Sequence, residues 1–461
     1  MTNIQWYSPL DSGTTEIARY SQAILPALYK TFCLGLVTDA EDNDSDEKFE
    51  CEKQVVGMEP INIYNIGNSH MHCSILQLAM QQAGVVILHD VSLFELGLAY
   101  ARKNADFSLR EVFLNEYGVQ SVKAFDDMFG GSTYAWHGHS QQQYDNFVAS
   151  YPLFQSFISN ARGIVVHSEF AQKRVKRIYD GPVIKLELPY AAPSSAITAR
   201  EHEEPCQIVF CGHAGPNRRL REFIQAWAEV SKPEFFRLSL YGAIDKADEI
   251  MALAAELGLA ELINIVGFVS EKELDKALSA SHLAINLRNP TMGETSASQL
   301  RYWSKGLPSI VTDIGWYSEL PHDVVIKVSP NREKQDIIAI LEKFISGDHS
   351  YYERGANGCK HLAEKHSIDR YVGRLAEYVA KIEESRLVIS EVDERLIGFI
   401  ASMCDDTEDS ALFENVVKKI SETFNGAEQI QSNSLSASFG GPSEASLNSS
   451  DSGIPDNHLN G

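Results

Sequence analysis

The feature of this sequence that most constrains its fold is an alternation of short apolar runs with helical patterns, which occurs in two separate series. In the first series, the runs IQWYS, INIYN and GVVILHD are separated by amphipathic stretches such as EIARYSQAILPALYK. Alternating strands and helices are typical of a parallel sheet with helices on both faces. Residues 1–189 are therefore predicted to form an α/β domain.

A second series of the same kind begins after a break in composition. Residues 190–205 are rich in Ala, Pro, Ser and charged residues, as is typical of an interdomain linker. The alternation restarts at CQIVFCG and continues through HLAINL and PSIVTD, which predicts a second Rossmann-like domain over residues 206–366. Two domains also suit the length of the chain, because single cores stop growing at roughly 250–300 residues. Two such domains facing each other would enclose a ligand-binding cleft.

The last part of the chain is predicted to be helical and then disordered. Residues 367–424 carry apolar residues at helical spacing, and we expect the first of these helices, IDRYVGRLAEYVAKIEES, to cross back to the N-terminal domain. Residues 425–461 are rich in Ser, Asn and Gly and poor in bulky apolar residues, so they cannot offset the entropy lost on ordering. A disordered tail is predicted there.

Composition and charge exclude several classes of protein. The sequence has no window of the ~18–20 uncharged apolar residues that a membrane span needs, and its N-terminus lacks the features of a signal peptide. We therefore expect a cytoplasmic protein, whose association with the inner face of the plasma membrane or with a protein partner would be peripheral. The formal net charge of −23 disfavours nucleic acid as a ligand. An anionic ligand must then be held by local Arg, Lys or backbone N–H groups.

No metal site is expected. The seven cysteines are scattered and form no C-x-x-C pair, which argues against a zinc site or a disulfide framework. The D-x-D within AEDNDSDEKFE (40–50) lies in a run of acidic residues typical of a solvated loop. His70 and His72 have the spacing of a metal pair but no obvious third ligand. A contact with substrate is an equally good interpretation of these two residues.

The stretch NPTMGETSASQL places Glu294 just before a predicted helix over residues 296–305. At the helix N-terminus, the N–H groups of Thr295, Ser296 and Ala297 have no intrahelical partner and could bind a phosphate. Glu294, an acceptor only, would then suit a sugar hydroxyl beside that phosphate. Alternatively, Glu294 only caps the helix through its dipole. The sequence leaves both interpretations open.

The stretch CGHAGPNRRLREF supplies candidate cations. Gly212 follows a predicted strand, and Arg218 and Arg219 come at the start of the next helix. Because the carboxyl ends of parallel strands face the cleft, these arginines could bind a diphosphate in bidentate fashion. A solvated basic helix face is the competing interpretation.

The N-terminal half offers two further candidates. Gly13 lies in the turn between the first strand and its helix, where a glycine allows close approach of a ligand. His89 and Asp90 directly follow the buried strand VVIL, and we favour contact with a ligand over a core role for them. Neither half contains G-x-G-x-x-G or a Walker loop, which argues against dehydrogenase or P-loop chemistry.

Several of these segments together resemble one family. GETSASQLRYWSKGLPSIVTDIGWYSELP, GHAGPNRRL and SPLDSGTTEIARYSQAILPAL resemble segments of glycosyltransferase family 4 (glycosyltransferase group 1), and YNIGNSHMHCSILQLAMQQAGVVILHDVSLFEL resembles its bacterial polysaccharide branch. The resemblance covers about residues 3 to 384. It implies the GT-B fold, with two facing Rossmann-like domains, and a retaining glycosyltransferase. Such an enzyme moves a sugar from a nucleotide-diphosphate donor to a carbohydrate or lipid-linked glycan, here in surface polysaccharide or glycoconjugate biosynthesis.

The resemblance also implies roles for particular residues in the C-terminal half. Glu294 matches the first glutamate of the E-x7-E motif, which contacts the donor sugar. The second glutamate, on the donor ribose, falls at Arg301, so this chain departs from the family there. An arginine seven residues after Glu294 lies close to the same helix face, and we expect it to bind the donor through charge. Arg218 matches the diphosphate-binding lysine, while the other phosphate-binding arginine falls at His213.

In the N-terminal half, His89 matches a histidine beside the anomeric carbon, and Gly13 matches the glycine of a loop that approaches donor and acceptor. The implied reaction is front-face attack assisted by the leaving phosphate, with no metal and no cofactor. Two alternatives stay open. One is a GT-B nucleotide-sugar epimerase, and the other is a non-catalytic glycosyltransferase-like subunit that binds a protein partner.

Overall fold

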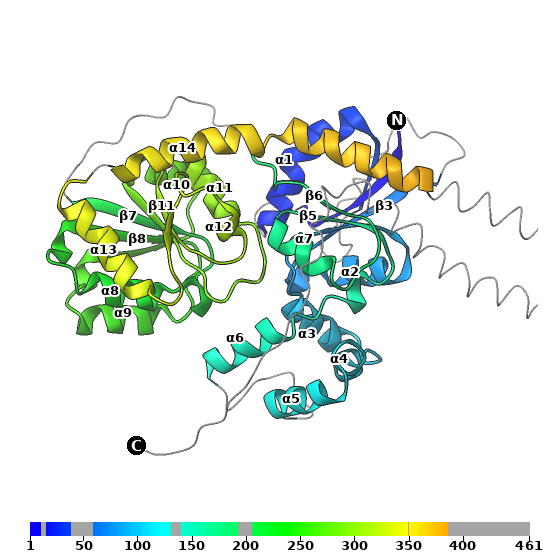
Figure 1. Cartoon of the computed structure of the whole chain (residues 1–461), viewed down its shortest axis with the longest axis horizontal. Helices are drawn as coiled ribbons and strands as arrows, with labels where there is room; N and C mark the ends of the chain where they lie inside the picture. Colours follow the sequence, from blue (N-terminus) through cyan, green and yellow to red (C-terminus); the bar gives the residue numbers. More distant parts are fainter. Residues whose placement is uncertain (11–14, 38–58, 131–139, 192–204, 349, 386–461) are drawn as a thin grey trace, which may run out of the picture.

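The computed structural model describes residues 1–10, 15–37, 59–130, 140–191, 205–348 and 350–385. Within these residues the chain forms two six-stranded sheets, each made of parallel strands with helices packed on both faces (Figure 1). The predicted α/β architecture with two Rossmann-like domains is thus confirmed. The predicted tail, the helices expected after residue 385 and the acidic segment 40–50 lie outside the described residues.

The N-terminal sheet has the strand order β2-β1-β3-β4-β5-β6. Its strands are nearly continuous apolar runs, as expected for a parallel sheet covered on both faces. The strands are β1 (Asn3–Tyr7), β2 (Cys33–Val37), β3 (Ile61–Ile66), β4 (Gly84–Leu88), β5 (Ala161–Val166) and β6 (Val183–Lys185). The helices packed against them are α1 (Glu16–Thr31), α2 (Cys73–Gln81) and α7 (Glu169–Val175), and a short 3-10 turn, η1 (His70–His72), precedes α2.

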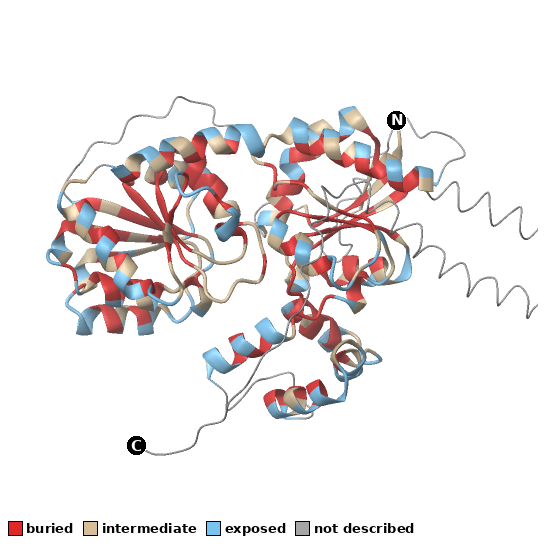
Figure 2. Ribbon diagram, in the orientation of Figure 1, coloured by how far each residue is buried: buried red, intermediate tan, exposed pale blue. Residues whose placement is uncertain are grey.

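The C-terminal sheet has the order β12-β11-β10-β7-β8-β9. Its strands are β7 (Cys206–Cys211), β8 (Phe236–Tyr241), β9 (Ile263–Gly267), β10 (Leu283–Asn286), β11 (Ser309–Thr312) and β12 (Ile326–Val328). Its helices are α8 (Leu220–Trp227), α9 (Ala247–Glu256), α10 (Glu271–Ala280), α11 (Ala297–Ser304), α12 (Trp316–Glu319), α13 (Glu333–Ile345) and α14 (Ser350–Lys365). A 3-10 turn, η3 (Pro216–Arg218), leads from β7 to α8. Figure 2 shows that buried residues fill both sheets and the inner faces of their helices.

A helical lobe, which the sequence analysis did not anticipate, is inserted between β4 and β5. It consists of α3 (Phe94–Lys103), α4 (Leu109–Tyr117), α5 (Val119–Phe129) and α6 (Gln141–Ser150), and it projects away from the sheet (Figure 1). Its core is aromatic: Phe113 stacks on Phe147 with ring centroids 5.5 Å apart, and Phe94 stacks on Phe129 at 5.8 Å. These pairs bury large apolar areas, and the cluster to which they belong continues into the core of the N-terminal sheet.

The helix over residues 368–385 returns to the N-terminal domain (Figure 1). Tyr371 lies 2.7 Å from the hydroxyl of Tyr20 on α1, and Tyr378 donates to the carbonyl of Pro182 at 2.6 Å. Gly163 on β5 leaves room for this helix, because a Cβ there would lie 2.4 Å from the hydroxyl of Tyr378. The last described helix is therefore built into the N-terminal domain.

No helix in the described part of the chain is long and apolar enough to cross a membrane. The five described cysteines are buried and unbonded to one another.

Candidate functional site

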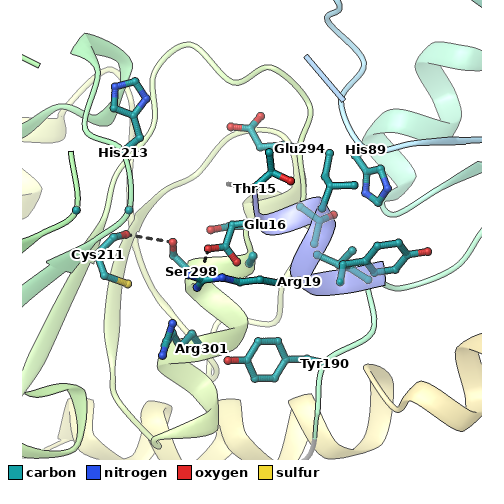
Figure 3. Close-up of a pocket in the computed structure, with 18 of the residues that line it drawn as sticks. Thr15, Glu16, Arg19, His89, Tyr190, Cys211, His213, Glu294, Ser298 and Arg301 are labelled. Atoms are coloured by element: carbon teal, nitrogen blue, oxygen red, sulfur yellow. Dashed lines mark hydrogen bonds and ion pairs between the residues drawn. The ribbon is translucent and has the colours of Figure 1, made fainter. Parts of the chain in front are cut away.

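A cavity of ≈ 800 Å³ lies between the two domains, at the carboxyl ends of both sheets. From the N-terminal domain it is lined by the start of α1 and by residues that follow β3 and β4. From the C-terminal domain it is lined by the β7–η3 turn, the segment after β10 and the first turn of α11. In Figure 3, Glu294 and His89 lie near the start of α1, and Cys211 and Ser298 lie across from them. Most of the predicted site residues therefore meet here.

The N-terminus of α11 opens onto the cavity. Ser296 caps the helix, since its hydroxyl accepts from the backbone N–H of Gln299, and Asn286 donates to the same hydroxyl at 3.2 Å. Ser298 is anchored to the carbonyl of Cys211 at 3.1 Å. Thr295 has a buried hydroxyl with no hydrogen-bond partner among the described residues. Because the first N–H groups of a helix lack intrahelical acceptors, this turn can bind an anion.

Glu294 does not cap α11, since Ser296 fills that role. Its carboxylate forms an ion pair with Arg288 and accepts from the hydroxyl of Thr291 at 3.2 Å and from the N–H of Met292 at 2.8 Å. Gly293, with φ of +82°, makes this tight turn possible. The turn places a part-buried carboxylate at the cavity wall, beside the helix mouth.

Arg218 and its neighbour Arg219 have different surroundings. Arg218 is buried and lines the cavity; it donates to Asn286 at 3.1 Å and lies over the ring of Phe210. The solvated interpretation of Arg218 is therefore wrong. Arg219 lies outside the cavity lining and pairs with Glu222 at 2.8 Å and Glu333 at 3.0 Å. The structure thus does not bring Arg219 to the site where the sequence placed it, because the αL turn at this residue directs it toward α13.

Arg288 is a cation that the sequence analysis missed. It lies just beyond the carboxyl end of β10, lines the cavity, and has a buried Nε without a partner in the described part of the chain. Burial and the nearby charge of Arg218 lower the pKa of Arg288 to about 10. Its place directly after a buried strand was the available signal, the same signal that pointed to His89.

Arg301 lies at the edge of the cavity near Tyr190 (Figure 3), where it belongs to an ion-pair network. It contacts Glu271 at 2.5 Å and Asp275 at 2.9 Å, both on α10. Burial opposes its charge, but the bonds to these carboxylates prevail and raise its pKa. Glu271 also pairs with Arg19 of α1 at 2.8 Å, so the network links the two domains across the cavity.

This difference predicts unequal effects of two arginine substitutions. We expect Arg218→Ala to weaken binding of a nucleoside diphosphate by about 1.5–3 kcal/mol, the scale of a hydrogen bond to a charged group. Arg301→Ala should weaken it about threefold at most, because its guanidinium is already satisfied by carboxylates. Titration calorimetry with a nucleoside diphosphate checks both values. An equal loss in the two variants would place Arg301 on the ligand.

His89 is held by a chain of hydrogen bonds. His167 Nδ1 lies 2.9 Å from the carbonyl of Leu186, His167 Nε2 lies 3.1 Å from His89 Nδ1, and His89 Nε2 lies 3.3 Å from Asn65 Oδ1. The carbonyl of Leu186 only accepts, which favours a proton on His167 Nδ1. Asn65 Oδ1 also accepts, because the amide nitrogen of Asn65 donates to the carbonyl of Tyr7 at 3.0 Å, and this favours a proton on His89 Nε2. His167 and Asn65 come from β5 and β3, so only the fold reveals them.

Buried polar groups surround His89. Burial and the neighbouring His167 and His72 lower the pKa of His89 well below its usual range. Burial lowers the pKa of His72 to about 4, and its Nδ1 lies 3.0 Å from the carbonyl of Asn65. Burial raises the pKa of Asp90, whose carboxylate accepts from the N–H of Asn68 at 2.8 Å. His72 and His89 therefore line the cavity as neutral imidazoles, and Asp90 lines it as well.

The other residues singled out in the sequence differ in whether they line the cavity. Gly212 lines the cavity with φ of +123°, a conformation that favours glycine. His213 also lines it but is exposed and pairs with Asp245 at 2.7 Å. Gly13 lies outside the described residues, and His70 lies outside the cavity lining. Among the described residues, no group of three or more His, Cys, Asp and Glu could hold a metal ion.

Comparisons with known proteins show what the chain is similar to. Residues 197–361 match the family model described as "Glycosyl transferases group 1". The chain is similar in structure to sucrose-phosphate synthase (tll1590) from Thermosynechococcus elongatus, with a TM-score of 0.53 and 12% identity over 84% of this chain and 100% of that chain. It is also similar to WaaG, a glycosyltransferase involved in lipopolysaccharide biosynthesis, with a TM-score of 0.50 and 13% identity over 82% of this chain and 99% of that chain.

A third similar structure is Anabaena Alr3699/HepE in complex with UDP, with a TM-score of 0.50 and 13% identity over 83% of this chain and 100% of that chain. No curated protein sequence matches the chain. At such low identity these similarities establish the fold, which is GT-B, as predicted. The match to glycosyl transferases group 1 covers nearly all of the C-terminal domain.

Proposed function

We propose that the protein is a retaining glycosyltransferase of family 4 that moves a sugar from a nucleotide-diphosphate donor to a carbohydrate or lipid-linked glycan acceptor. The observation that carries this proposal is the interdomain cavity, in which the α11 N-terminus and Arg218 face the same space as Glu294 and His89. One wall suits a diphosphate, and the other groups suit hydroxyls.

Two of the similar structures support the nucleotide and sugar parts of the proposal. Anabaena Alr3699/HepE has been solved with UDP and, separately, with UDP and glucose. WaaG is described as acting in lipopolysaccharide biosynthesis, and by analogy we assign this chain to the synthesis of surface polysaccharide or glycoconjugate. Peripheral association with a membrane or a protein partner would bring a lipid-linked acceptor to the cavity mouth.

The residues of the cavity have complementary tasks in the proposed reaction. Arg218 and the α11 N-terminus bind and stabilise the leaving diphosphate, and Glu294 orients the sugar through its hydroxyls. His89 lines the same cavity, where its ring can contact a hydroxyl of the donor sugar or of the acceptor. The acceptor hydroxyl attacks from the face that the diphosphate leaves, and the leaving phosphate takes its proton.

The proposal includes no divalent metal, because the cations and the helix terminus supply the positive charge. We therefore expect full activity in the presence of EDTA. The measurement compares initial rates with and without chelator, and with Mg²⁺ or Mn²⁺ added back. Complete loss in EDTA that either ion restores would contradict this part of the proposal.

A panel of nucleotide sugars tests the proposed function directly. Each donor is incubated with glycan acceptors and without them, and the products are separated by mass spectrometry. Transfer of the sugar with retained anomeric configuration is the expected result. Epimerisation without an acceptor would instead show a nucleotide-sugar epimerase, and tight donor binding without turnover would show a non-catalytic subunit.

A further inference from the structure

We propose that Arg288 is a second diphosphate-binding cation. When the donor binds, Arg288 exchanges its ion pair with Glu294 for an ion pair with the diphosphate. Glu294 then becomes free to accept hydrogen bonds from the donor sugar. The inference rests on the proposed nucleotide-sugar site. It adds an order of events to that site, in which the diphosphate must arrive before the carboxylate can act on the sugar.

The first support is the position of Arg288. It lies beside Arg218, close enough for the two charges to repel, and this repulsion together with burial lowers its pKa. Two guanidinium groups with little exposure at one cavity wall are unfavourable unless anions lie between or beside them. Glu294 is the ion-pair partner of Arg288, and the part-buried Asp90 is the other carboxyl group near it.

The second support is the unused hydrogen-bonding capacity. The Nε–H groups of Arg218 and Arg288 and the hydroxyl of Thr295 are buried without a partner among the described residues, and all three residues line the cavity. A buried donor without an acceptor is unfavourable, because it has lost its hydrogen bonds to water. A diphosphate, with many acceptor oxygens, can satisfy several of these donors together.

The third support is the set of contacts that Glu294 makes within the protein. One carboxylate oxygen pairs with Arg288, and the other accepts from Thr291 and Met292. Both carboxylate oxygens are therefore engaged, one by Arg288 and the other by residues 291 and 292. When Arg288 pairs with the diphosphate instead, one oxygen of Glu294 loses its cationic partner. That oxygen can then accept hydrogen bonds from the sugar that is attached to the diphosphate.

The exchange predicts opposite effects of two substitutions on the binding of inorganic pyrophosphate. Arg288→Gln should weaken binding at least tenfold. Glu294→Gln should tighten it about threefold to tenfold, because the neutral amide no longer competes for Arg288. In the double variant, the gain from Glu294→Gln should disappear, since the competition needs both partners.

Titration calorimetry with pyrophosphate measures all four proteins, and circular dichroism verifies that each is folded. Glu222→Gln is the matched control, because it removes a carboxylate from Arg219 outside the cavity; it should change affinity less than twofold. Should Arg288→Gln not fold, Arg288→Lys keeps the charge but loses the Nε–H, and it should weaken binding about threefold or more.

The outcomes separate this inference from the proposed function. Weaker or unchanged binding in Glu294→Gln, or unchanged binding in Arg288→Gln, overturns the exchange, as does failure of the unsubstituted protein to bind pyrophosphate. If the signs are as expected while no nucleotide sugar is turned over, the exchange stands and the glycosyltransferase proposal fails. If sugar is transferred but Glu294→Gln weakens pyrophosphate binding, the glycosyltransferase proposal stands and the exchange fails.

Discussion

Glu294→Gln is expected to lower turnover by a factor of about 10²–10³, the usual scale for the loss of one transition-state contact. The amide keeps the size of the side chain but loses the charge that would stabilise an oxocarbenium-like state and accept from sugar hydroxyls. Steady-state rates with the donor found in the nucleotide-sugar panel provide the measurement. The effect should lie in kcat, because the carboxylate is released only after the diphosphate is bound.

Glu222→Gln again serves as the control and should leave turnover unchanged. Thermal unfolding of Glu294→Gln should occur at a modestly lower temperature than in the unsubstituted protein, because Arg288 loses its carboxylate partner. The protein should still fold, since the turn at residues 291–294 retains its N–H donor to the side-chain oxygen. Normal turnover in a folded Glu294→Gln protein would remove this carboxylate from the mechanism. A loss of turnover that accompanies unfolding would point to a structural role.

The second large effect concerns stability in mild acid. Burial lowers the pKa values of His72, His167 and His366 to about 4 each. The unfolded value is about 6.5, so the unfolded chain binds more protons than the folded chain between about pH 6.5 and pH 4. The contribution of these histidines to stability is therefore complete above pH 6.5 and is lost as the pH falls toward 4. Each should lower the free energy of unfolding by about 2 kcal/mol between pH 7 and pH 5.

Buried carboxyl groups reduce this acid effect. Burial raises the pKa values of Asp90 and Glu116, so the folded chain gains stability as these groups take up protons at low pH. We expect a net loss of stability between pH 7 and pH 5, because three buried histidines contribute to it together.

Urea unfolding at pH 7 and pH 5 measures this difference. His167→Phe should show a smaller loss between the two pH values, while His213→Gln, an exposed site, should behave like the unsubstituted protein. Equal stability at both pH values would mean that these histidines are protonated in the folded state without penalty.

Periodicity accounts for how much of the architecture could be predicted. The quoted apolar runs form strands, and the quoted amphipathic stretches form helices. Examples are α1, α11 and the helix over 368–385. Local hydrophobic spacing is sufficient there, because each element buries one face in its own domain. The lobe from α3 to α6 was missed. Its aromatic residues pack against one another across the insertion, in a cluster that also contains residues of the sheet.

The site residues also divide into those that a local sequence pattern could predict and those that it could not. Residues that directly follow a strand, such as His89 and Gly212, could be assigned to the cleft because parallel strands end at one edge of the sheet. The same reasoning could not separate Arg218 from Arg219, since the αL conformation at Arg219 decides which side chain enters the cavity. It also placed Arg301 on the donor, where the structure shows two carboxylates of α10 already bound to it.

The sequence by itself determined the two α/β domains, the cleft between them and the helix mouth at Glu294, because these follow from spacing along the chain and from the shared direction of parallel strands. Only the tertiary structure decided which side chains act together. The Arg288–Glu294 pair, the His89–His167 contact and the link from Arg301 to α10 join residues whose partners are set by packing and by competition among nearby charges. Such choices depend on distances of a few ångströms between separate elements, which no local pattern of residues encodes.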